Sequence, residues 1–229
     1  MKVGTDGVLV GAWASVRPSD RRILDIGTGT GLIALMLAQR APEAQVTGID
    51  IEPVAEAQAN AGASPWGGRI RFRQTRVQDF RPGEGFDLIV SNPPFFVDSL
   101  LCPDAGRTVA RHAVSLPFGE LRDAVVRLLR PGGRFAVVLP ADEAERFIGL
   151  CGSALQLVRR TDVRTTPRRP VKRVLMEFRA AAETAAETAS EAVSEPFRPV
   201  VDSLVIGTGE HETYTPEYRA LTRDFYLKF

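Results

Sequence analysis

Cysteine and histidine are scarce in this sequence, which has two residues of each among 229. Cys102 and Cys151 form no Cys-x-x-Cys pair, which fits neither a disulfide framework nor a zinc-ligand pattern, so we interpret both as ordinary thiols and predict no metal site. No apolar run approaches the roughly 20 residues that a membrane-spanning helix needs. The first residues also lack the apolar segment of a signal peptide, so we expect a cytoplasmic protein without a membrane partner.

A strong net charge is also missing, because 29 basic residues oppose 28 acidic ones for a formal charge of +1. This balance neither favours nor excludes a nucleic-acid partner, since a basic patch can lie within a neutral total. With 44% hydrophobic residues, the chain can bury one sizeable core. We therefore predict one catalytic domain, while the oligomeric state stays open with a monomer favoured.

Short β-branched runs alternate with longer segments of helical period between residues 21 and 140. The predicted strands are Ile23 to Ile26, Gln45 to Ile49, Ile70 to Gln74, Phe86 to Val90 and Arg134 to Leu139. The predicted helices between them are Leu32 to Arg40, Val54 to Ala61 and Leu121 to Leu129, the last closed by a turn at Pro131-Gly132-Gly133. This alternation is typical of a doubly wound α/β fold, in which helices cover both faces of a mostly parallel sheet.

The sequence after residue 140 follows a different pattern. After a predicted helix over Glu143 to Cys151 come two extended runs, Leu155 to Arg164 and Val171 to Phe178. The prolines and basic residues between these runs indicate an antiparallel hairpin at the end of the sheet. A short strand over Ser203 to Ile206 and a helix over Pro216 to Phe225 complete the predicted elements.

Residues 180–196 consist almost entirely of alanine, glutamate, threonine and serine. Four glutamates there are spaced by four residues with no lysine to pair with them, namely Glu183, Glu187, Glu191 and Glu195. These carboxylates would repel one another on one face of a helix, so we favour a flexible insert. The predicted organisation is a main domain over residues 1–179, this insert, and a C-terminal strand and helix over residues 197–229 that pack on the same domain.

A glycine-rich turn follows the first predicted strand. The strand leads into Gly27-Thr28-Gly29-Thr30-Gly31 and then an apolar helix, so the backbone there can approach a ligand closely. The dinucleotide fingerprint Gly-x-Gly-x-x-Gly would need glycine where the sequence has Leu32, which argues against NAD. A strand-terminal acid before Gly-x-Gly-x-Gly instead resembles class I methyltransferases, which bind the methionine end of S-adenosylmethionine at this turn. The resemblance implies cofactor contacts from Asp25, Gly27, Thr28, Gly29 and Gly31.

An acidic residue follows the second predicted strand. Asp50 comes 19 residues after Gly31, about where a carboxylate accepts both hydroxyls of a ribose. Glu52 is its competitor, but Glu52 suits the start of the next helix better. Beyond the third strand, where such enzymes usually carry an acid for the cofactor adenine, the sequence has Arg76, and Asp79 is the nearest substitute.

The fourth predicted strand ends at Asn92-Pro93-Pro94-Phe95, at the edge where ligands bind in open α/β sheets. Methyl transfer from a sulfonium needs a lone pair in line with the S–CH3 bond, but the lone pair of an adenine N6 amine is delocalised into the ring. The Asn92 side-chain oxygen and the Pro93 carbonyl can accept the two amine hydrogens, while the prolines stiffen the turn. Phe95 can stack on the base, a contact worth roughly 1–3 kcal/mol. We predict Asn92, Pro93, Pro94 and Phe95 as the catalytic loop, with Asn92 also bordering the cofactor.

Longer stretches resemble one family, the bacterial tRNA adenine-N6 methyltransferases that modify the adenosine just 3′ of the anticodon of a valine tRNA. The similar stretches run nearly end to end and include Met1 to Gly7, Leu24 to Gly31, Ser64-Pro65-Trp66, Phe86 to Pro94, Arg160 to Val163, Ala220-Leu221-Thr222 and Phe225-Tyr226-Leu227. The resemblance implies S-adenosylmethionine as the cofactor and tRNA as the partner. It also implies an N-terminal loop over the cofactor, which places Lys2, Thr5 and Asp6 near it. Phe95 departs from the family pattern, in which tyrosine is common.

One segment concentrates positive charge. Residues 155–179 hold eight basic residues against two acidic ones, a local charge of +6. We predict RNA contacts there and at a second patch, from Arg164, Arg168, Arg169, Lys172, Arg107 and Arg111. An anticodon loop suits this arrangement because its bases are single-stranded. Two other methyl acceptors share the chemistry of the Asn-Pro-Pro loop and stay open as alternatives, namely a release-factor glutamine amide and guanine N2 of ribosomal RNA.

Overall fold

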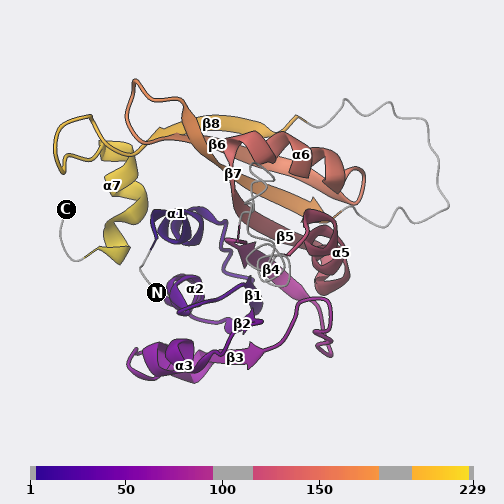
Figure 1. Cartoon of the computed structure of the whole chain (residues 1–229). Helices are drawn as coiled ribbons and strands as arrows, with labels where there is room; N and C mark the ends of the chain where they lie inside the picture. Colours follow the sequence, from indigo (N-terminus) through magenta and orange to yellow (C-terminus); the bar gives the residue numbers. More distant parts are fainter. Residues whose placement is uncertain (1–3, 95–115, 181–197, 227–229) are drawn as a thin grey trace, which may run out of the picture.

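The computed structural model describes residues 4–94, 116–180 and 198–226. Within them, an eight-stranded sheet has the order β3-β2-β1-β4-β5-β7-β6-β8 and carries helices on both faces (Figure 1). The mostly parallel α/β fold predicted from the sequence is therefore confirmed.

Five parallel strands form the first half of the sheet. They are β1 (Arg22–Ile26), β2 (Gln45–Asp50), β3 (Ile70–Gln74), β4 (Phe86–Ser91) and β5 (Leu129–Pro140). The chain runs from β1 outward to β3 and then returns to place β4 on the other side of β1. Ligands of open α/β sheets bind at such a reversal of strand order, beyond the carboxyl ends of the strands.

The start of β5 differs from the prediction. Leu129 already pairs with Phe86, and Arg134 pairs with Leu88, so the residues between them bulge out of the register with β4. The predicted turn at Pro131-Gly132-Gly133 lies within this bulge, where Gly132 has a φ of +74°. The turn thus interrupts the strand without ending it.

The second half of the sheet is antiparallel at its centre. β7 (Val171–Ala180) pairs with both β5 and β6 (Leu155–Arg164), and β8 (Val200–Val205) lies parallel to β6. The predicted hairpin is present, but its predicted place at the end of the sheet is wrong because β8 adds a strand outside it. Pro140 pairs with Arg173, so the turn between β6 and β7 lies at the same edge as the carboxyl ends of the parallel strands.

Helices cover the two faces of the sheet separately. They are α1 (Thr5–Trp13), α2 (Leu32–Arg40), α3 (Ala55–Gly62), α5 (Phe118–Leu128), α6 (Ala141–Cys151) and α7 (Pro216–Thr222), with the short 3-10 turns η1 (Gly67–Arg69) and η2 (Arg223–Phe225). One core cluster packs α1 and α2 on Ile23 of β1, and a second packs α5 and α6 on the opposite face, with Leu24. Within the three described ranges, none of the helices has the length and apolar character to span a membrane.

Helix α1 was not predicted, because the family resemblance implied a loop over its first residues. Gly7 and Gly11 lower its helix propensity by about 1 kcal/mol each relative to alanine. Both glycines instead serve packing on α2, since a Cβ at position 11 would lie 2.8 Å from the Met36 Sδ and one at position 7 would lie 3.3 Å from Leu32. Tertiary contact with α2 therefore supplies the stability that local propensity lacks.

A buried ion pair fixes the chain between α1 and β1 to the sheet. Arg134 of β5 and Asp20 are each 2% exposed, and a guanidinium nitrogen lies 2.6 Å from the carboxylate. The same Arg134 nitrogen donates to the Ser15 carbonyl at 2.9 Å. Trp13, at the end of α1, donates its indole N–H to the Thr161 hydroxyl of β6 at 2.8 Å. Helix α1 is thus held against both halves of the sheet.

The C-terminal segment joins the same body. β8 extends the sheet, and α7 lies beside α1 (Figure 1). Leu221 and Phe225 pack beside Val8 and Ala12 of α1. The predicted insert over residues 180–196 lies, apart from Ala180 at the end of β7, outside the described residues.

Candidate active site

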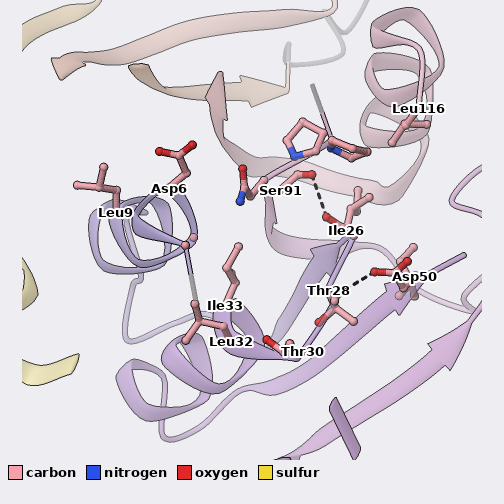
Figure 2. Close-up of a pocket in the computed structure, with 18 of the residues that line it drawn as sticks. Asp6, Leu9, Ile26, Thr28, Thr30, Leu32, Ile33, Asp50, Ser91 and Leu116 are labelled. Atoms are coloured by element: carbon pink, nitrogen blue, oxygen red, sulfur yellow. Dashed lines mark hydrogen bonds between the residues drawn. The ribbon is translucent and has the colours of Figure 1, made fainter. Parts of the chain in front are cut away.

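A cavity of about 820 Å³ lies at the carboxyl ends of the parallel strands. Its walls come from the ends of β1, β2 and β4, the segment after β3, the first turn of α1, and the β6–β7 hairpin. Figure 2 shows Asp6 and Leu9 of α1 on one side of it, Asp50 on the other, and Ser91 between them. This is the edge that the motif positions in the sequence predicted.

The glycine-rich turn forms the floor of the cavity. Gly27, Gly29 and Gly31 all have positive φ, at +73°, +52° and +81°, and the Gly27 and Thr28 N–H groups both donate to the Ile49 carbonyl of β2. Gly27, Thr28 and Gly29 line the cavity, whereas Gly31 does not. Gly31 packs behind the turn, where a Cβ would lie 3.0 Å from the Phe72 ring, so the structure gives it a packing role and does not support its predicted cofactor contact.

Asp25 lies beneath this turn rather than in the cavity wall. Its Oδ2 accepts hydrogen bonds from the Thr28 hydroxyl at 2.6 Å and from the Ala34 N–H at 3.2 Å. Its Oδ1 is buried and has no hydrogen-bond partner among the described residues. Burial raises the pKa of the Asp25 carboxyl to about 7, although the bonds from Thr28 and Ala34 oppose the shift. Asp25 therefore ties the turn to the start of α2.

Asp50 ends β2 and lines the cavity. One carboxylate oxygen accepts the Gly29 N–H at 2.8 Å, drawn in Figure 2, and the other accepts the Glu52 N–H at 3.0 Å. Each oxygen keeps a second lone pair for a ligand hydroxyl. Glu52 also lines the cavity and is exposed, so the structure brings both of the acids considered from the sequence to this wall.

The wall after β3 is built differently from the prediction. Thr75, Arg76, Val77 and Gln78 line the cavity, but Asp79 does not. Arg127 of α5 fixes this segment by donating to the Val77 carbonyl at 2.8 Å and the Phe80 carbonyl at 2.7 Å. The predicted adenine contact from Asp79 is therefore not supported, because the segment presents its neighbour Gln78 instead.

The end of β4 carries the Asn-Pro-Pro segment into the cavity wall. The Ser91 hydroxyl donates to the Ile26 carbonyl at 2.9 Å and joins the ends of β4 and β1 (Figure 2). Asn92, Pro93 and Pro94 line the cavity, while Phe95 lies outside the described residues. The Asn92 Oδ1 is buried and has no hydrogen-bond partner in the described part of the chain. An unpaired buried acceptor costs the folded protein about 1–3 kcal/mol. Such an atom in a cavity wall is explained by a ligand that donates a hydrogen bond to it when bound.

The first turn of α1 closes another side of the cavity. Thr5, Asp6 and Gly7 line it, as the family resemblance implied for the first two, and Lys2 lies outside the described residues. The Asp6 carboxylate accepts from Arg173 of β7 at 2.7 Å. A Cβ at Gly7 would lie 4.0 Å from the Asn92 side-chain nitrogen, so α1 packs directly beside the Asn-Pro-Pro segment.

The basic hairpin reaches the same cavity. Thr165, Lys172 and Arg173 line it, whereas Arg164, Arg168 and Arg169 do not. Those three arginines are carried by the same hairpin, at the sheet edge where the cavity opens. Arg107 and Arg111 lie outside the described residues.

Several lining residues escaped the sequence prediction, namely Leu116, Thr165, Arg173 and Ile206. No local motif marks them. Strand pairing in the second half of the sheet brings Thr165, Arg173 and Ile206 to the cavity, and Leu116 lies just before α5. Arg173 was counted only as part of the basic segment. In the described ranges, no group of three or more His, Cys, Asp or Glu side chains gathers as metal ligands would.

Comparisons with known proteins agree with this geometry. The model of the methyltransferase small domain family matches residues 8–146. A tRNA1(Val) (adenine(37)-N6)-methyltransferase of Phocaeicola vulgatus is 44% identical over 99% of this chain and 91% of its own length. A relative of the same name from Musicola paradisiaca is 41% identical over 99% of this chain and 88% of its own.

Solved structures agree on the fold. A predicted O-methyltransferase from Agrobacterium tumefaciens matches with a TM-score of 0.67 and 18% identity, covering 96% of each chain. An N-methyltransferase from Bradyrhizobium japonicum in complex with S-adenosyl-L-homocysteine matches with a TM-score of 0.51 and 22% identity, covering 70% of this chain and 78% of its own. With the matching family model and relatives above 40% identity over nearly the whole chain, this protein belongs to the methyltransferase small domain family and, within it, to the family of tRNA1(Val) (adenine(37)-N6)-methyltransferases.

Proposed function

We propose that this protein transfers a methyl group from S-adenosylmethionine to the N6 amine of adenosine 37, just 3′ of the anticodon, in a valine tRNA. The observation that carries the proposal is the buried Asn92 Oδ1, an acceptor without a donor in the wall of the cavity. Family membership supports the identity of the nucleoside and of the tRNA. A tRNA-modifying enzyme acts where tRNA is found, so we also propose a cytoplasmic location.

The cavity offers the groups that S-adenosylmethionine needs. The turn at Gly27, Thr28 and Gly29 brings backbone close to the ligand, and the Asp50 carboxylate suits the ribose hydroxyls. The bound donor supplies a methyl group on a positively charged sulfur. Its acceptor amine would lie at the Asn-Pro-Pro segment, which is held to the end of β1 by the bond from Ser91 to Ile26.

The Asn-Pro-Pro segment orients the acceptor. The N6 lone pair of adenine is delocalised into the ring, so it must be turned toward the methyl group. The Asn92 Oδ1 and the Pro93 carbonyl accept one amine hydrogen each, which fixes the direction of the lone pair. Proline fixes φ near −65° and so limits the movement of this carbonyl. Positioning, rather than a strong base, is the main contribution of these residues.

Proton release needs no dedicated base in this scheme. The N6 proton becomes acidic only after the methyl group has moved, and it can then leave to solvent. Asp6, an acid near Asn92, is already paired with Arg173 at 2.7 Å. We therefore propose that Asp6 holds α1 to the hairpin and does not accept the N6 proton.

The basic hairpin suits the phosphates on either side of the target nucleotide. Lys172 lines the cavity, and Arg164, Arg168 and Arg169 lie along the same hairpin at the cavity edge. Their cations attract the RNA backbone without reading its sequence. A base of the anticodon loop is single-stranded, so it can enter the cavity without opening a duplex.

The test is transfer of labelled methyl from S-adenosylmethionine to valine tRNA, to ribosomal RNA and to release factor, followed by digestion and identification of the product. We expect N6-methyladenosine from the tRNA, at the nucleoside just 3′ of the anticodon. A valine tRNA with guanosine at that position is the matched control and should take up no label. Label found instead in N2-methylguanosine or in methylglutamine would contradict the proposal.

A further inference from the structure

The wall after β3 is where the base of the methyl donor would lie. The strand order β3-β2-β1-β4 sets the sequence of contacts along the cavity. A donor whose methyl group faces Asn92 after β4 and whose ribose meets Asp50 after β2 extends its adenine toward β3. The residues that line the cavity there are Thr75, Arg76, Val77 and Gln78.

An adenine 6-amino group needs a hydrogen-bond acceptor, and most groups of this wall cannot supply one. The Arg76 guanidinium carries donors only. The Arg76 carbonyl already accepts the N–H groups of Asp79 and Phe80, each at 3.1 Å. Arg76 therefore cannot bind the amine through its side chain, and its carbonyl is committed to the turn.

The next two carbonyls each accept one hydrogen bond from an arginine that holds the segment. The Val77 carbonyl accepts from Arg127 at 2.8 Å, and the Gln78 carbonyl accepts from Arg81 at 2.6 Å. Among the described side chains of this wall, the Gln78 amide and the Thr75 hydroxyl are the two that carry an oxygen able to accept a hydrogen bond. The Thr75 hydroxyl donates its hydrogen to the Arg76 carbonyl at 3.3 Å, so this hydroxyl is bound to the backbone of the same segment.

Glu120 of α5 decides which way the Gln78 amide points. The Gln78 Nε2 donates a hydrogen bond to a Glu120 carboxylate oxygen. An ionised carboxylate only accepts hydrogen bonds, so it binds the NH2 end of the amide and cannot bind the oxygen end. The Gln78 Oε1 is thereby kept free to accept a hydrogen from another group.

We propose that Gln78 recognises the 6-amino group of the donor's adenine through its Oε1, and that Glu120 is a positioning residue that fixes the orientation of the Gln78 amide. The inference rests on the proposed use of the cavity for S-adenosylmethionine. It makes Gln78 a determinant of cofactor specificity at a wall that carries Arg76 in place of an acid.

The experiment compares two ligands by calorimetry on the full chain without RNA. One ligand is S-adenosylhomocysteine, and the other is its analogue with hydrogen in place of the 6-amino group. We expect the wild type to bind the analogue about tenfold more weakly, as for the loss of one hydrogen bond. Gln78→Leu should bind both ligands about equally, near the affinity of the wild type for the analogue. Retained affinity for the analogue also shows that the variant is folded.

Three further variants identify which side chains cause the preference for the ligand with the 6-amino group. Asp79→Asn is the matched control and should discriminate between the two ligands as the wild type does. Thr75→Val tests the rival acceptor and should keep the ratio of the two affinities, whether or not it weakens both. Glu120→Gln should discriminate less, because an amide partner no longer excludes the flipped orientation of Gln78. If Gln78→Leu still prefers S-adenosylhomocysteine as strongly as the wild type does, the proposal for Gln78 is overturned. Loss of this preference in Asp79→Asn or Thr75→Val would overturn it as well. An undiminished preference in Glu120→Gln would overturn the role of Glu120.

These readouts separate this inference from the proposed function. If the wild type binds S-adenosylhomocysteine but methylates no valine tRNA, the assignment of the RNA substrate fails while the ligand comparison stands. If the wild type binds neither ligand, the assignment of the cavity to the donor fails, and with it the role of Gln78.

Discussion

Replacement of Asn92 by alanine should change stability and activity in opposite ways. The Asn92 Oδ1 is buried without a partner, a condition that costs the folded protein about 1–3 kcal/mol. Alanine removes this cost but also loses some packing of the side chain, so the net change in unfolding free energy should lie between zero and a gain of about 1 kcal/mol. For a chain of this size, 1 kcal/mol corresponds to roughly 2–4 °C in Tm. We expect a Tm that is unchanged or slightly raised.

The activity of the same variant should fall steeply. Without the Asn92 oxygen, one N6 hydrogen loses its acceptor and the lone pair is no longer directed at the methyl group. Removal of one preorganised polar group from an active site typically lowers kcat by about 10²- to 10³-fold. Binding of S-adenosylhomocysteine should remain nearly intact, because the turn at Thr28 and the Asp50 carboxylate are not altered.

Three measurements on one preparation check this reasoning, namely thermal denaturation, calorimetry with S-adenosylhomocysteine, and single-turnover methylation of valine tRNA. Asn92→Asp is the control, since it keeps an acceptor at the same position and should retain more activity than Asn92→Ala. A Tm lowered by several degrees would refute the argument and make Asn92 a structural residue. Loss of affinity for S-adenosylhomocysteine would show instead that Asn92 holds the donor.

The free energy of unfolding should also depend on pH through Asp25. Burial raises the pKa of its carboxyl to about 7 from an ordinary 3.8. Between these two values the folded protein therefore holds a proton that the unfolded chain has released. The stabilisation from this proton is full below the ordinary pKa and is lost as pH rises to about 7. Asp25→Asn should therefore have a higher Tm than the wild type at about pH 8, and this difference should disappear near pH 4. Breaking the buried pair by Arg134→Met should lower the free energy of unfolding by about 3–5 kcal/mol in urea denaturation, because it leaves the Asp20 carboxylate buried and unpaired; a loss under 1 kcal/mol would contradict this. The double variant Arg168→Ala and Arg169→Ala should raise the KM for tRNA and reduce the salt dependence of tRNA binding by up to about two counterions, with unchanged affinity for S-adenosylhomocysteine. An unchanged salt slope would place the RNA elsewhere on the protein.

Much of the fold could be predicted from the sequence because its signals are local. β1, β2, β3 and β4 begin and end within about one residue of the predicted bounds, since short apolar runs bounded by turns mark buried strands. Asp50 and Asn92 were predicted at the cavity because each directly follows such a strand. In a parallel sheet the strand ends meet at one edge, so chain position alone brings these two residues together.

The helical structure of α1 and the position of β8 at the edge of the sheet could not be predicted, because both depend on tertiary contacts. The family resemblance implied a loop at the start of α1, and the close approach of Leu32 to Gly7 and of Met36 to Gly11 explains the two glycines of the helix. The position of β8 outside the hairpin, and the contact of Arg173 with Asp6, follow from pairings between segments far apart in the chain. No local pattern encodes such pairings.

The sequence alone thus determined that the Asn-Pro-Pro segment and the glycine-rich turn lie at one cavity, beyond the carboxyl ends of the strands. Which side chains of the segment after β3 line the cavity was decided by the tertiary structure. Asp79 and Gln78 are neighbours in the chain, and the bonds from Arg127 set the segment so that Gln78 lines the cavity and Asp79 does not. The physical reason is that a strand end fixes the direction of the residue that follows it, whereas the direction of a loop side chain depends on distant groups that hold the loop.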